Sequence, residues 1–243
     1  MKSPALVAAL TLAAAPLFAA PVTFESEETP ATLIELFTSE GCSSCPPADA
    51  WMSRLKSRPD LWKRVVPVAF HVDYWDGLGW PDRFASAANT TRQHRYAAAW
   101  RSESVYTPGL VLDGHEWRGW FRESLPEPSP TKVGRLAITL HDGQTDVVFT
   151  RLGGVTPLSV ELALLGGNLE SNVTRGENSG HKLRHDFTVL HFVSAPLHRQ
   201  GDRFTTTVPF SLKSAEGAVA AAAWIVPGEA RPPIQATGGW LQP

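Results

Sequence analysis

The segment that most constrains the fold is Cys-Ser-Ser-Cys-Pro-Pro, residues 42–47, because it separates a predicted strand from a predicted helix. The preceding run TLIELFT (32–38) is short and almost continuously apolar, as in a buried parallel strand. After the prolines, which suit a first helical turn, apolar residues recur along one helical face: Ala48, Trp51, Met52, Leu55. A second apolar run, VVPVAFHV (65–72), follows. This order predicts an α/β sheet with a crossover helix.

Both cysteines of the chain lie in this motif, so its position suggests their chemistry. Cys42 would face the unpaired N–H groups and positive dipole end of the helix, which lower a thiol pKa below its free value of about 8.5. Cys45 lies one helical turn away, close enough to resolve a mixed disulfide. The strand–motif–helix context therefore predicts a redox pair in a thioredoxin-like fold.

Two further features would complete a thioredoxin-like site. In VYTPGLVLDG (105–114) a proline leads into an apolar strand, so we predict that Pro108 is cis and that Thr107 offers backbone groups to an extended peptide. Glu35 is the charged residue in the apolar run LIELF. If it is buried near the disulfide, its pKa is raised and it would accept a proton. An exposed or ion-paired Glu35 is the alternative.

The segment HVDYWDGLGW (71–80) follows the second predicted strand. Ligands of open α/β sheets collect at the carboxyl ends of the strands, so Asp73, Trp75 and Trp80 are candidate substrate-binding residues. The alternative is a packed loop in which the tryptophans join the core and the aspartates cap turns. His71 would also allow a copper or zinc site with the two cysteines, although no second cysteine pair or metal-spaced histidine pair accompanies it.

The chain changes character at a Pro-rich stretch, 126–131, which predicts a linker between a thioredoxin-like domain at 28–125 and a β-rich domain at 132–243. The second part consists of short alternating or β-branched runs separated by turn residues, which is typical of a β-sandwich. The alanine run 218–223 fits a helix as well as a strand. The polar segment RGENSGHKLRHDF (175–187) predicts a loop or hairpin packed against the first domain.

The first twenty residues predict a secretory signal peptide, since one lysine precedes a mostly Ala/Leu/Val run that ends in small residues. A membrane anchor is the alternative, but the run is short and interrupted by Pro16. We therefore expect a periplasmic or secreted bacterial protein with no stable membrane insertion after cleavage. The net charge of −2 lacks the basic field that attracts nucleic acid, so no nucleic-acid partner is expected.

Several segments together resemble the bacterial secreted proteins of the DUF1223 family: LFTSEGCSSCPPADA, HVDYWDGLGWPDRFAS, RQHRYAAAW, YTPGLVLDG and RGENSGHKLRHDFTVL. The resemblance extends over residues 32–190 and implies a thioredoxin-like domain followed by a β-rich extension. It implies no particular reaction. The family pattern has a glutamine after Tyr-Thr-Pro, where this chain has Gly109, and the smaller residue would open the approach to the disulfide.

These observations predict an extracytoplasmic thiol–disulfide oxidoreductase. Cys42 would attack, Cys45 would resolve, Pro108 would shape the peptide-binding loop and Glu35 would move the proton. The disulfide itself carries two electrons, so no cofactor is expected, and the partners would be protein or peptide thiols and disulfides. A non-catalytic binding module with a structural disulfide is the alternative, followed by a copper or zinc carrier. Oxidase, isomerase and reductase share this geometry, so the sequence leaves the direction of electron flow open.

Overall fold

The computed structural model describes residues 20–122, 125–127, 129–151, 157–228 and 231–241. These residues form a mostly β structure with two α-helices, α1 (Pro46–Arg54) and α2 (Ala87–Trp100). Short 3-10 turns lie at Leu55–Ser57, Asp76–Leu78, Trp120–Arg122 and Leu212–Ser214. The signal peptide predicted at 1–20 lies, apart from its last residue, outside the described residues.

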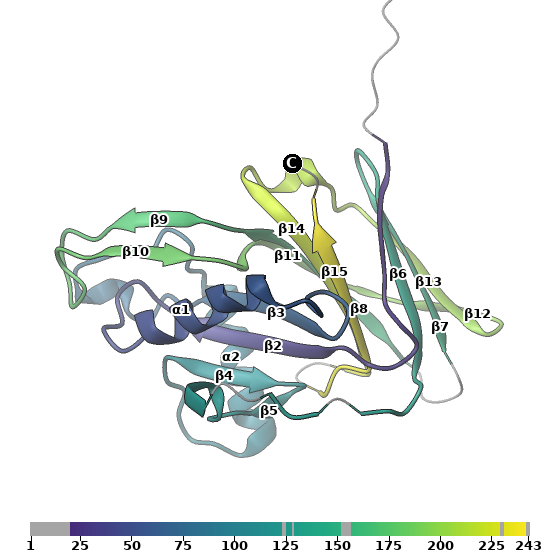
Figure 1. Ribbon diagram of the computed structural model, residues 1–243, viewed down its shortest axis with the longest axis horizontal. Coiled ribbons are helices and arrows are strands. Elements are labelled where there is room, and N and C mark those ends of the chain that lie inside the picture. The colour runs from purple at the N-terminus through teal and green to yellow at the C-terminus, as the bar shows by residue number, and fades with distance from the viewer. Residues whose placement is uncertain (1–19, 123–124, 128, 152–156, 229–230, 242–243) are drawn as a thin grey trace, which may run out of the picture.

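One eight-stranded sheet extends through the molecule in the order β15-β14-β8-β11-β3-β2-β4-β5 (Figure 1). Its first-half strands are β2 (Thr32–Thr38), β3 (Val65–His71), β4 (Gly109–Leu112) and β5 (His115–Glu116). Its second-half strands are β8 (Ser159–Gly166), β11 (Thr188–Pro196), β14 (Ala218–Val226) and β15 (Gln235–Trp240). β2 and β3 are parallel, and β11 joins β3 in parallel where Thr188 pairs with Ala69. Strands from both sides of the Pro-rich stretch thus share one sheet.

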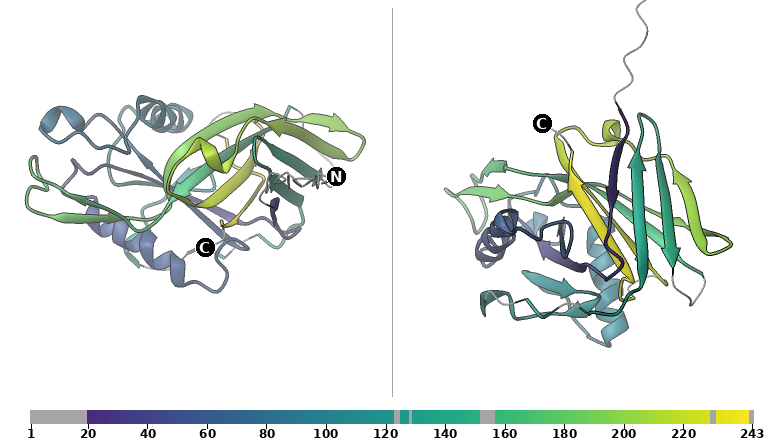
Figure 2. Two further views of the ribbon diagram at one scale, coloured as in Figure 1. Left: turned by 90° about the horizontal axis from the view of Figure 1, so that it is seen from above. Right: turned by 45° about the vertical axis from the view of Figure 1, so that its right-hand side comes forward.

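The two helices cover opposite faces of the β2–β3 region (Figure 2). The apolar face predicted around Trp51 is buried, as expected for a crossover helix. The second helix, α2, begins at Ala87. Ser86 sets this start, because its side-chain oxygen caps the helix by accepting the N–H of Asn89 at 3.2 Å.

A second, five-stranded sheet packs on the second-half strands of the large sheet. Its order is β1 (Val22–Glu25), β6 (Gly134–Leu140), β7 (Thr145–Arg151), β13 (Arg203–Val208) and β12 (His198–Gln200). The core between the sheets contains Leu136, Phe149 and Leu162, so this part is sandwich-like, as predicted. The alanine run 218–223 lies in strand β14, and its alternate alanines face two different cores.

A separate hairpin, β9 (Leu169–Asn172) and β10 (Lys182–His185), extends from the large sheet and lies alongside α1 (Figure 1). Its turn comprises residues 173–181. The sequence prediction of a loop or hairpin packed against the first half is therefore confirmed, and it is a hairpin.

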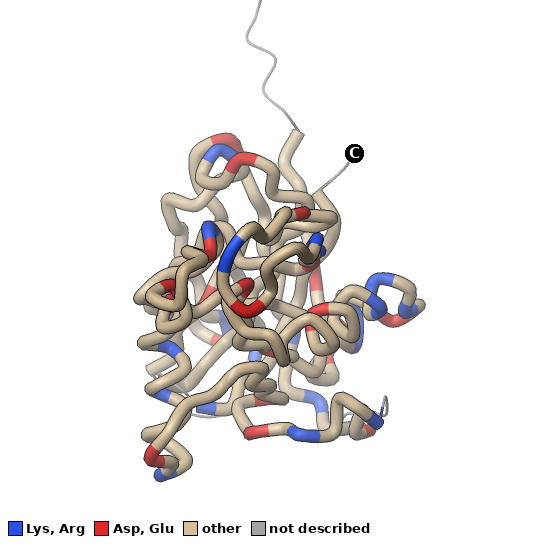
Figure 3. Tube along the Cα trace, turned by 90° about the vertical axis from the view of Figure 1, so that its left-hand side faces the viewer, with Lys and Arg blue, Asp and Glu red and all other residues tan. Residues whose placement is uncertain are grey.

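The end of the molecule that carries α1 and this hairpin mixes acidic and basic residues, with neither sign collected into one field (Figure 3). Within the described ranges, no helix has both the length and the apolar character needed to cross a membrane.

Candidate functional site

Cys42 and Cys45 form a disulfide at the N-terminus of α1, with their Cα atoms 5.5 Å apart. Cys45 is the N-cap residue, and its carbonyl oxygen accepts the N–H groups of Ala48 at 2.9 Å and Asp49 at 3.1 Å. Prolines fill the start of this helix, where a backbone N–H would have no partner. Both cysteines are fully buried. The disulfide thus lies at the strand–helix junction that the sequence indicated.

The loop of Thr107 and Pro108 lies against the cysteine loop, and the peptide bond between these two residues is cis, as predicted. The Ser44 hydroxyl donates to the Thr107 carbonyl oxygen at 3.4 Å and lies 3.3 Å from Cys42 Sγ. Trp75 Nε1 donates to Thr107 Oγ1 at 2.8 Å. The structure therefore brings together Trp75, Thr107 and the cysteines, which the sequence had singled out separately.

The turn of the β9–β10 hairpin covers the cysteine loop from the other half of the chain. Asn178 Nδ2 donates to the carbonyl oxygens of Glu40 at 2.9 Å and Cys42 at 3.0 Å. The Ser43 N–H donates to Glu177 Oε2 at 3.0 Å. Sequence reasoning placed this segment near the first half but missed its role at the disulfide. Its one signal was a set of polar residues in a glycine-containing turn.

Buried acidic and imidazole side chains adjoin the cysteine loop. His185 Nε2 lies 3.2 Å from Glu40 Oε1, and His185 Nδ1 lies 3.9 Å from Asp49 Oδ2. Thr38 Oγ1 donates to Asp49 Oδ2 at 3.1 Å, and Trp80 Nε1 donates to Glu40 Oε2 at 2.7 Å. The predicted Trp80 thus lies beside Glu40, two residues before Cys42.

His71 belongs to the same buried cluster. Its Nδ1 lies 2.6 Å from Asp82 Oδ2, which also accepts the Glu40 N–H at 2.8 Å. Burial alone would raise the pKa of Asp82, but His71 and the N–H groups bonded to it lower that pKa below its usual value. Within the described part of the chain, no three or more His, Cys, Asp and Glu side chains are grouped to hold a metal ion.

The pKa of the Asp49 carboxyl group is shifted strongly by its surroundings. Burial raises its pKa to about 7, and His185 and the Thr38 hydroxyl partly oppose this rise. For Glu40, by contrast, the neighbouring side chains of His185, Ser171 and Trp80 outweigh burial and lower the pKa. The Asp49 carboxyl group would therefore change its protonation near neutral pH.

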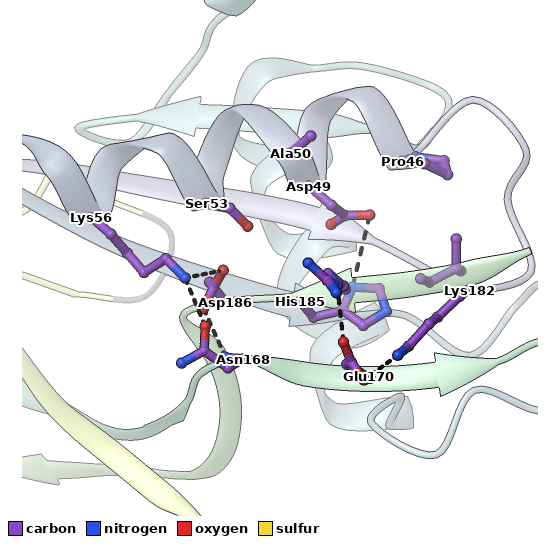
Figure 4. A pocket seen from close by; sticks show the side chains of 12 residues that line it. Pro46, Asp49, Ala50, Ser53, Lys56, Asn168, Glu170, Lys182, His185 and Asp186 are labelled. Carbon is purple, nitrogen blue, oxygen red and sulfur yellow. Dashed lines mark hydrogen bonds and ion pairs between the residues drawn. The ribbon is translucent and has the colours of Figure 1, made fainter. Parts of the chain in front are cut away.

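Asp49 lines a pocket of about 570 Å³ between α1 and the β9–β10 hairpin. Figure 4 shows its side chain pointing from α1 toward His185 on β10. Ion pairs lie along the pocket wall: Lys56 Nζ is 2.8 Å from Asp186 Oδ2, and Lys182 Nζ is 2.5 Å from Glu170 Oε2. The pocket connects the buried Asp49 and His185 to a charged, solvent-facing rim.

Glu35 is fully buried, and it is also ion-paired. Arg92 Nε donates to Glu35 Oε2 at 2.8 Å, and the Tyr96 hydroxyl donates to Glu35 Oε1 at 2.6 Å. Arg92 also bonds Glu161 of β8 at 2.9 Å. These contacts join Glu35 on β2 to α2 and β8. The buried carboxyl groups next to the cysteines are instead those of Glu40, in the cysteine loop, and Asp49, on α1.

Asp73 is tied to α2. The Thr90 hydroxyl donates to Asp73 Oδ1 at 2.6 Å, and the Asp73 N–H donates to Thr90 Oγ1 at 3.2 Å. This is the turn-fixing role that the sequence analysis kept as an alternative to substrate binding.

An aromatic depression of about 470 Å³ opens beside Pro108. It is lined by Tyr106, Pro108, Trp117, Arg118, Trp120 and Phe121. Phe121 is 62% exposed, so this depression presents apolar surface to solvent. Sequence reasoning missed this depression, although the aromatic cluster EWRGWF (116–121) was visible.

The comparisons with known proteins agree with this architecture. The family model described as "Protein of unknown function (DUF1223)" matches residues 33–226. The crystal structure of protein AGR_C_4864 from Agrobacterium tumefaciens is similar, with a TM-score of 0.66 and 24% identity over 87% of this chain and 95% of that one. HBP35 of Porphyromonas gingivalis is also similar, with a TM-score of 0.59 and 14% identity over 89% of this chain and 76% of that one. At these identities the likeness concerns the fold. No curated protein matches.

Proposed function

Because the chain belongs to the DUF1223 family, which is described as a family of unknown function, we propose its function from its own geometry. The protein is an extracytoplasmic thiol–disulfide oxidoreductase, in which residues 28–125 form a thioredoxin-like unit and residues 132–243 a β-rich extension. The observation that carries the proposal is the Cys42–Cys45 disulfide at the N-terminus of α1, with the Thr107–Pro108 loop against it.

The chemistry follows from this placement. Reduction of the disulfide would leave Cys42 as a thiolate at the positive end of the α1 dipole. Pro46 and Pro47 supply no N–H group there, and the next two N–H groups donate to the Cys45 carbonyl oxygen. Cys45 would resolve a mixed disulfide between Cys42 and a substrate, so electrons pass between the two proteins without another cofactor. Two serines separate the cysteines and supply no positive charge, so the thiolate is stabilised by dipoles alone.

Substrate proteins would bind beside Pro108. The backbone of Thr107 would pair with an extended peptide, while the aromatic depression holds an apolar side chain of that peptide. Trp75 would hold the loop in place through Thr107. The substrate class is therefore a protein with an exposed cysteine next to apolar residues.

The buried state of the disulfide implies a gating step. Both cysteines are fully buried, and the 173–181 turn is bonded to Ser43 and Cys42. An attacking thiolate needs a straight approach to Cys42 Sγ, so this turn has to move before exchange.

The same burial favours a second function, a non-catalytic binding module with a structural disulfide. In that case the aromatic depression would bind a partner while the cysteines stay oxidised. A copper or zinc carrier has no comparable support, since His71 is bonded to Asp82.

The reduction potential decides between the two functions. Mature protein, without residues 1–20, is equilibrated in glutathione buffers and its thiols are alkylated and counted by mass. A potential between roughly −120 and −270 mV supports the oxidoreductase. A potential below about −300 mV, or a disulfide that reduces only in denaturant, supports the binding module.

Trapping supplies an independent check in the bacterial periplasm. Cys45→Ser should accumulate mixed disulfides through Cys42, and the Cys42→Ala, Cys45→Ser double variant is the matched control. Absence of reducible adducts, while an established oxidoreductase gives them in parallel, would refute the assignment.

A further inference from the structure

The Ser44 hydroxyl has one proton and two acceptors within reach. It donates to the Thr107 carbonyl oxygen at 3.4 Å, and it lies 3.3 Å from Cys42 Sγ. Cys42 has no proton of its own to donate while it is in the disulfide. Because a hydroxyl group has a single proton, it serves one of these acceptors at the expense of the other. The bond to Thr107 therefore depends on the state of the cysteine sulfur.

The two acceptors change rank when the disulfide is reduced. A neutral sulfur is a weak acceptor, so in the oxidised protein the hydroxyl favours the carbonyl oxygen of Thr107. A thiolate is a charged acceptor, and hydrogen bonds to charged groups are about twice as strong as those between neutral groups. Reduction to a Cys42 thiolate should therefore turn the Ser44 hydroxyl away from Thr107 and toward Cys42.

We infer that Ser44 is a redox-dependent positioning residue, whose hydroxyl covers the Thr107 carbonyl oxygen in the oxidised protein and leaves it free in the reduced protein, so that the reduced protein binds extended peptides more tightly. The inference rests on the proposed oxidoreductase function. It also names the substrate as a protein disulfide, because a reductase or an isomerase meets its substrate while its own cysteines are reduced.

The Thr107 carbonyl oxygen is the acceptor that a bound peptide would use. An extended peptide pairs through its own backbone N–H groups, and Thr107 directly precedes Pro108, which lines the aromatic depression. In the oxidised protein a peptide N–H has to displace the Ser44 hydroxyl, whereas in the reduced protein it does not. Ser44 is exposed, so water also competes for its hydroxyl and we expect a modest difference in affinity, about threefold.

Peptide binding and reduction are linked through this choice of acceptor. If a peptide binds the reduced protein about threefold more tightly, saturating peptide must favour reduction by the same factor. For a two-electron couple, this factor makes the reduction potential about 14 mV less negative. A substrate bound beside Pro108 would thus help to keep the cysteine pair reduced until exchange.

The reaction then starts from the reduced pair. The Cys42 thiolate attacks one sulfur of the substrate disulfide, and the other substrate sulfur leaves as a thiolate. Cys45 loses its proton to solvent and attacks Cys42 Sγ, so the bond from Cys42 to the substrate breaks, the Cys42–Cys45 bond forms and a second substrate thiolate leaves. The substrate gains two electrons, and a dithiol donor then reduces the Cys42–Cys45 pair again.

The test measures the affinity of one peptide for the oxidised and for the reduced protein by calorimetry. The peptide has blocked ends and carries serine between two phenylalanines, so it forms no disulfide. Because it has no charge, neither the Cys42 thiolate nor the nearby carboxylate of Glu177 attracts or repels it. The pH is one at which thiolate absorbance shows that Cys42 is ionised. The reduced protein should bind about threefold more tightly, and saturating peptide should move the potential by about 14 mV.

Variants of the two serines show which hydroxyl is responsible. Ser44→Ala frees the Thr107 carbonyl oxygen in both states, so the oxidised variant should bind as tightly as reduced wild type and the redox difference should disappear. Ser44→Thr keeps a hydroxyl and should restore the difference. Ser43→Ala is the matched control, because the Ser43 hydroxyl bonds to Glu177, and it should keep the wild-type ratio of affinities.

The double variant Cys42→Ala, Cys45→Ala separates the effect of the thiolate from the loss of the disulfide. It has neither, so the Ser44 hydroxyl should stay on the Thr107 carbonyl oxygen and the peptide should bind as it does to oxidised wild type. If this variant binds like reduced wild type, or if Ser44→Ala keeps the redox difference, the role of Ser44 is overturned.

The outcomes also separate this role from the proposed function. Equal affinities of the two forms, with a reduction potential between roughly −120 and −270 mV, overturn the role of Ser44 and retain the oxidoreductase. A peptide that binds neither form removes the peptide site beside Pro108 together with the role of Ser44, whereas trapping with Cys45→Ser still tests the oxidoreductase. A disulfide that exchanges only in denaturant overturns both.

Discussion

Asn178 is hydrogen-bonded to the carbonyl oxygen of Cys42 at 3.0 Å, across a sequence separation of 136 residues. The same side-chain amide bonds the Glu40 carbonyl oxygen at 2.9 Å. The loop before α1, which carries the disulfide, is thus held by a residue from the second half of the chain. A hairpin turn far away in the sequence therefore packs against the loop that carries the disulfide.

The first prediction concerns this turn. Asn178→Ala removes the side-chain donor of the buried Glu40 carbonyl oxygen and one of two donors of the Cys42 carbonyl oxygen, which keeps the Cys45 N–H. The free energy of unfolding should therefore fall by about 1–3 kcal/mol. Because the turn is released, dithiothreitol should reduce the native disulfide several-fold faster. Quenched alkylation followed by mass spectrometry measures the rate. The neighbouring Ser179→Ala, which alters an exposed hydroxyl, is the control. Equal rates in both variants would refute gating by this turn.

Glu177 provides the second prediction. Its carboxylate accepts the Ser43 N–H at 3.0 Å, which places a negative charge beside Cys42. Glu177→Gln keeps an oxygen acceptor and removes the charge, so the Cys42 thiol pKa in the reduced protein should fall and the disulfide should become more oxidising. Thiolate absorbance against pH gives the pKa. The difference from wild type should shrink in high salt, since the group is exposed, and a difference that salt leaves unchanged would contradict a charge effect.

The third prediction tests the aromatic depression. Phe121→Ser removes its most exposed ring, so a cysteine peptide with flanking aromatic residues should bind the Cys45→Ser protein about tenfold more weakly. A cysteine peptide flanked by serine should be unaffected. Leu212→Ser, an exposed apolar residue elsewhere, is the matched control. If the aromatic and serine peptides lose the same affinity in Phe121→Ser, the depression is not the substrate surface.

The fourth prediction concerns Arg92. It pairs with the buried Glu35 and Glu161, so Arg92→Met leaves two buried carboxylates without a cation. The free energy of unfolding should fall by about 3–5 kcal/mol. Arg118→Met, which breaks an exposed pair, should leave the free energy of unfolding close to that of wild type. Chemical denaturation measures the free energy of unfolding of both variants. A loss in Arg92→Met no larger than that in Arg118→Met would contradict a stabilising role for the Arg92 ion pairs.

The fifth prediction is the pH dependence of stability. The pKa of Asp49 is raised from 3.8 to about 7 in the folded protein, so the folded state binds more protons than the unfolded state between these values. This contribution is complete below pH 3.8 and is lost as the pH rises through about 7. Asp49→Asn should gain stability relative to wild type over that range, by roughly 4 kcal/mol at most. Unfolding curves of the oxidised proteins near pH 4 and pH 8 measure it, and a constant difference would contradict the raised pKa.

The sequence predicted the elements around Cys42 well, because local patterns determine them. The apolar run before the motif, the helical face around Trp51 and the proline of the loop at 107–108 each carry a short-range signal. The turn residues of 175–187 predicted a loop or hairpin there, and the structure has a hairpin, β9–β10.

Sequence patterns did not predict the contacts of residues whose positions depend on long-range packing. Glu35 stood out because it interrupts an apolar run, yet its partner Arg92 is 57 residues away. Asp49 looked like an ordinary helix residue, and its burial depends on the hairpin that covers α1. The pairing of Thr188 with Ala69 also has no local signal, so a chain divided at 126–131 did not reveal its shared sheet.

That shared sheet limits how the protein can be divided. A fragment ending at residue 125 would keep the cysteines but lose β11, leaving the edge of β3 and its apolar faces without a neighbour. Unpaired edges of this kind bind other chains and promote aggregation. The Cys-Ser-Ser-Cys segment is therefore not a transplantable module, and insertions or deletions in the β-rich half should alter the packing around the cysteines.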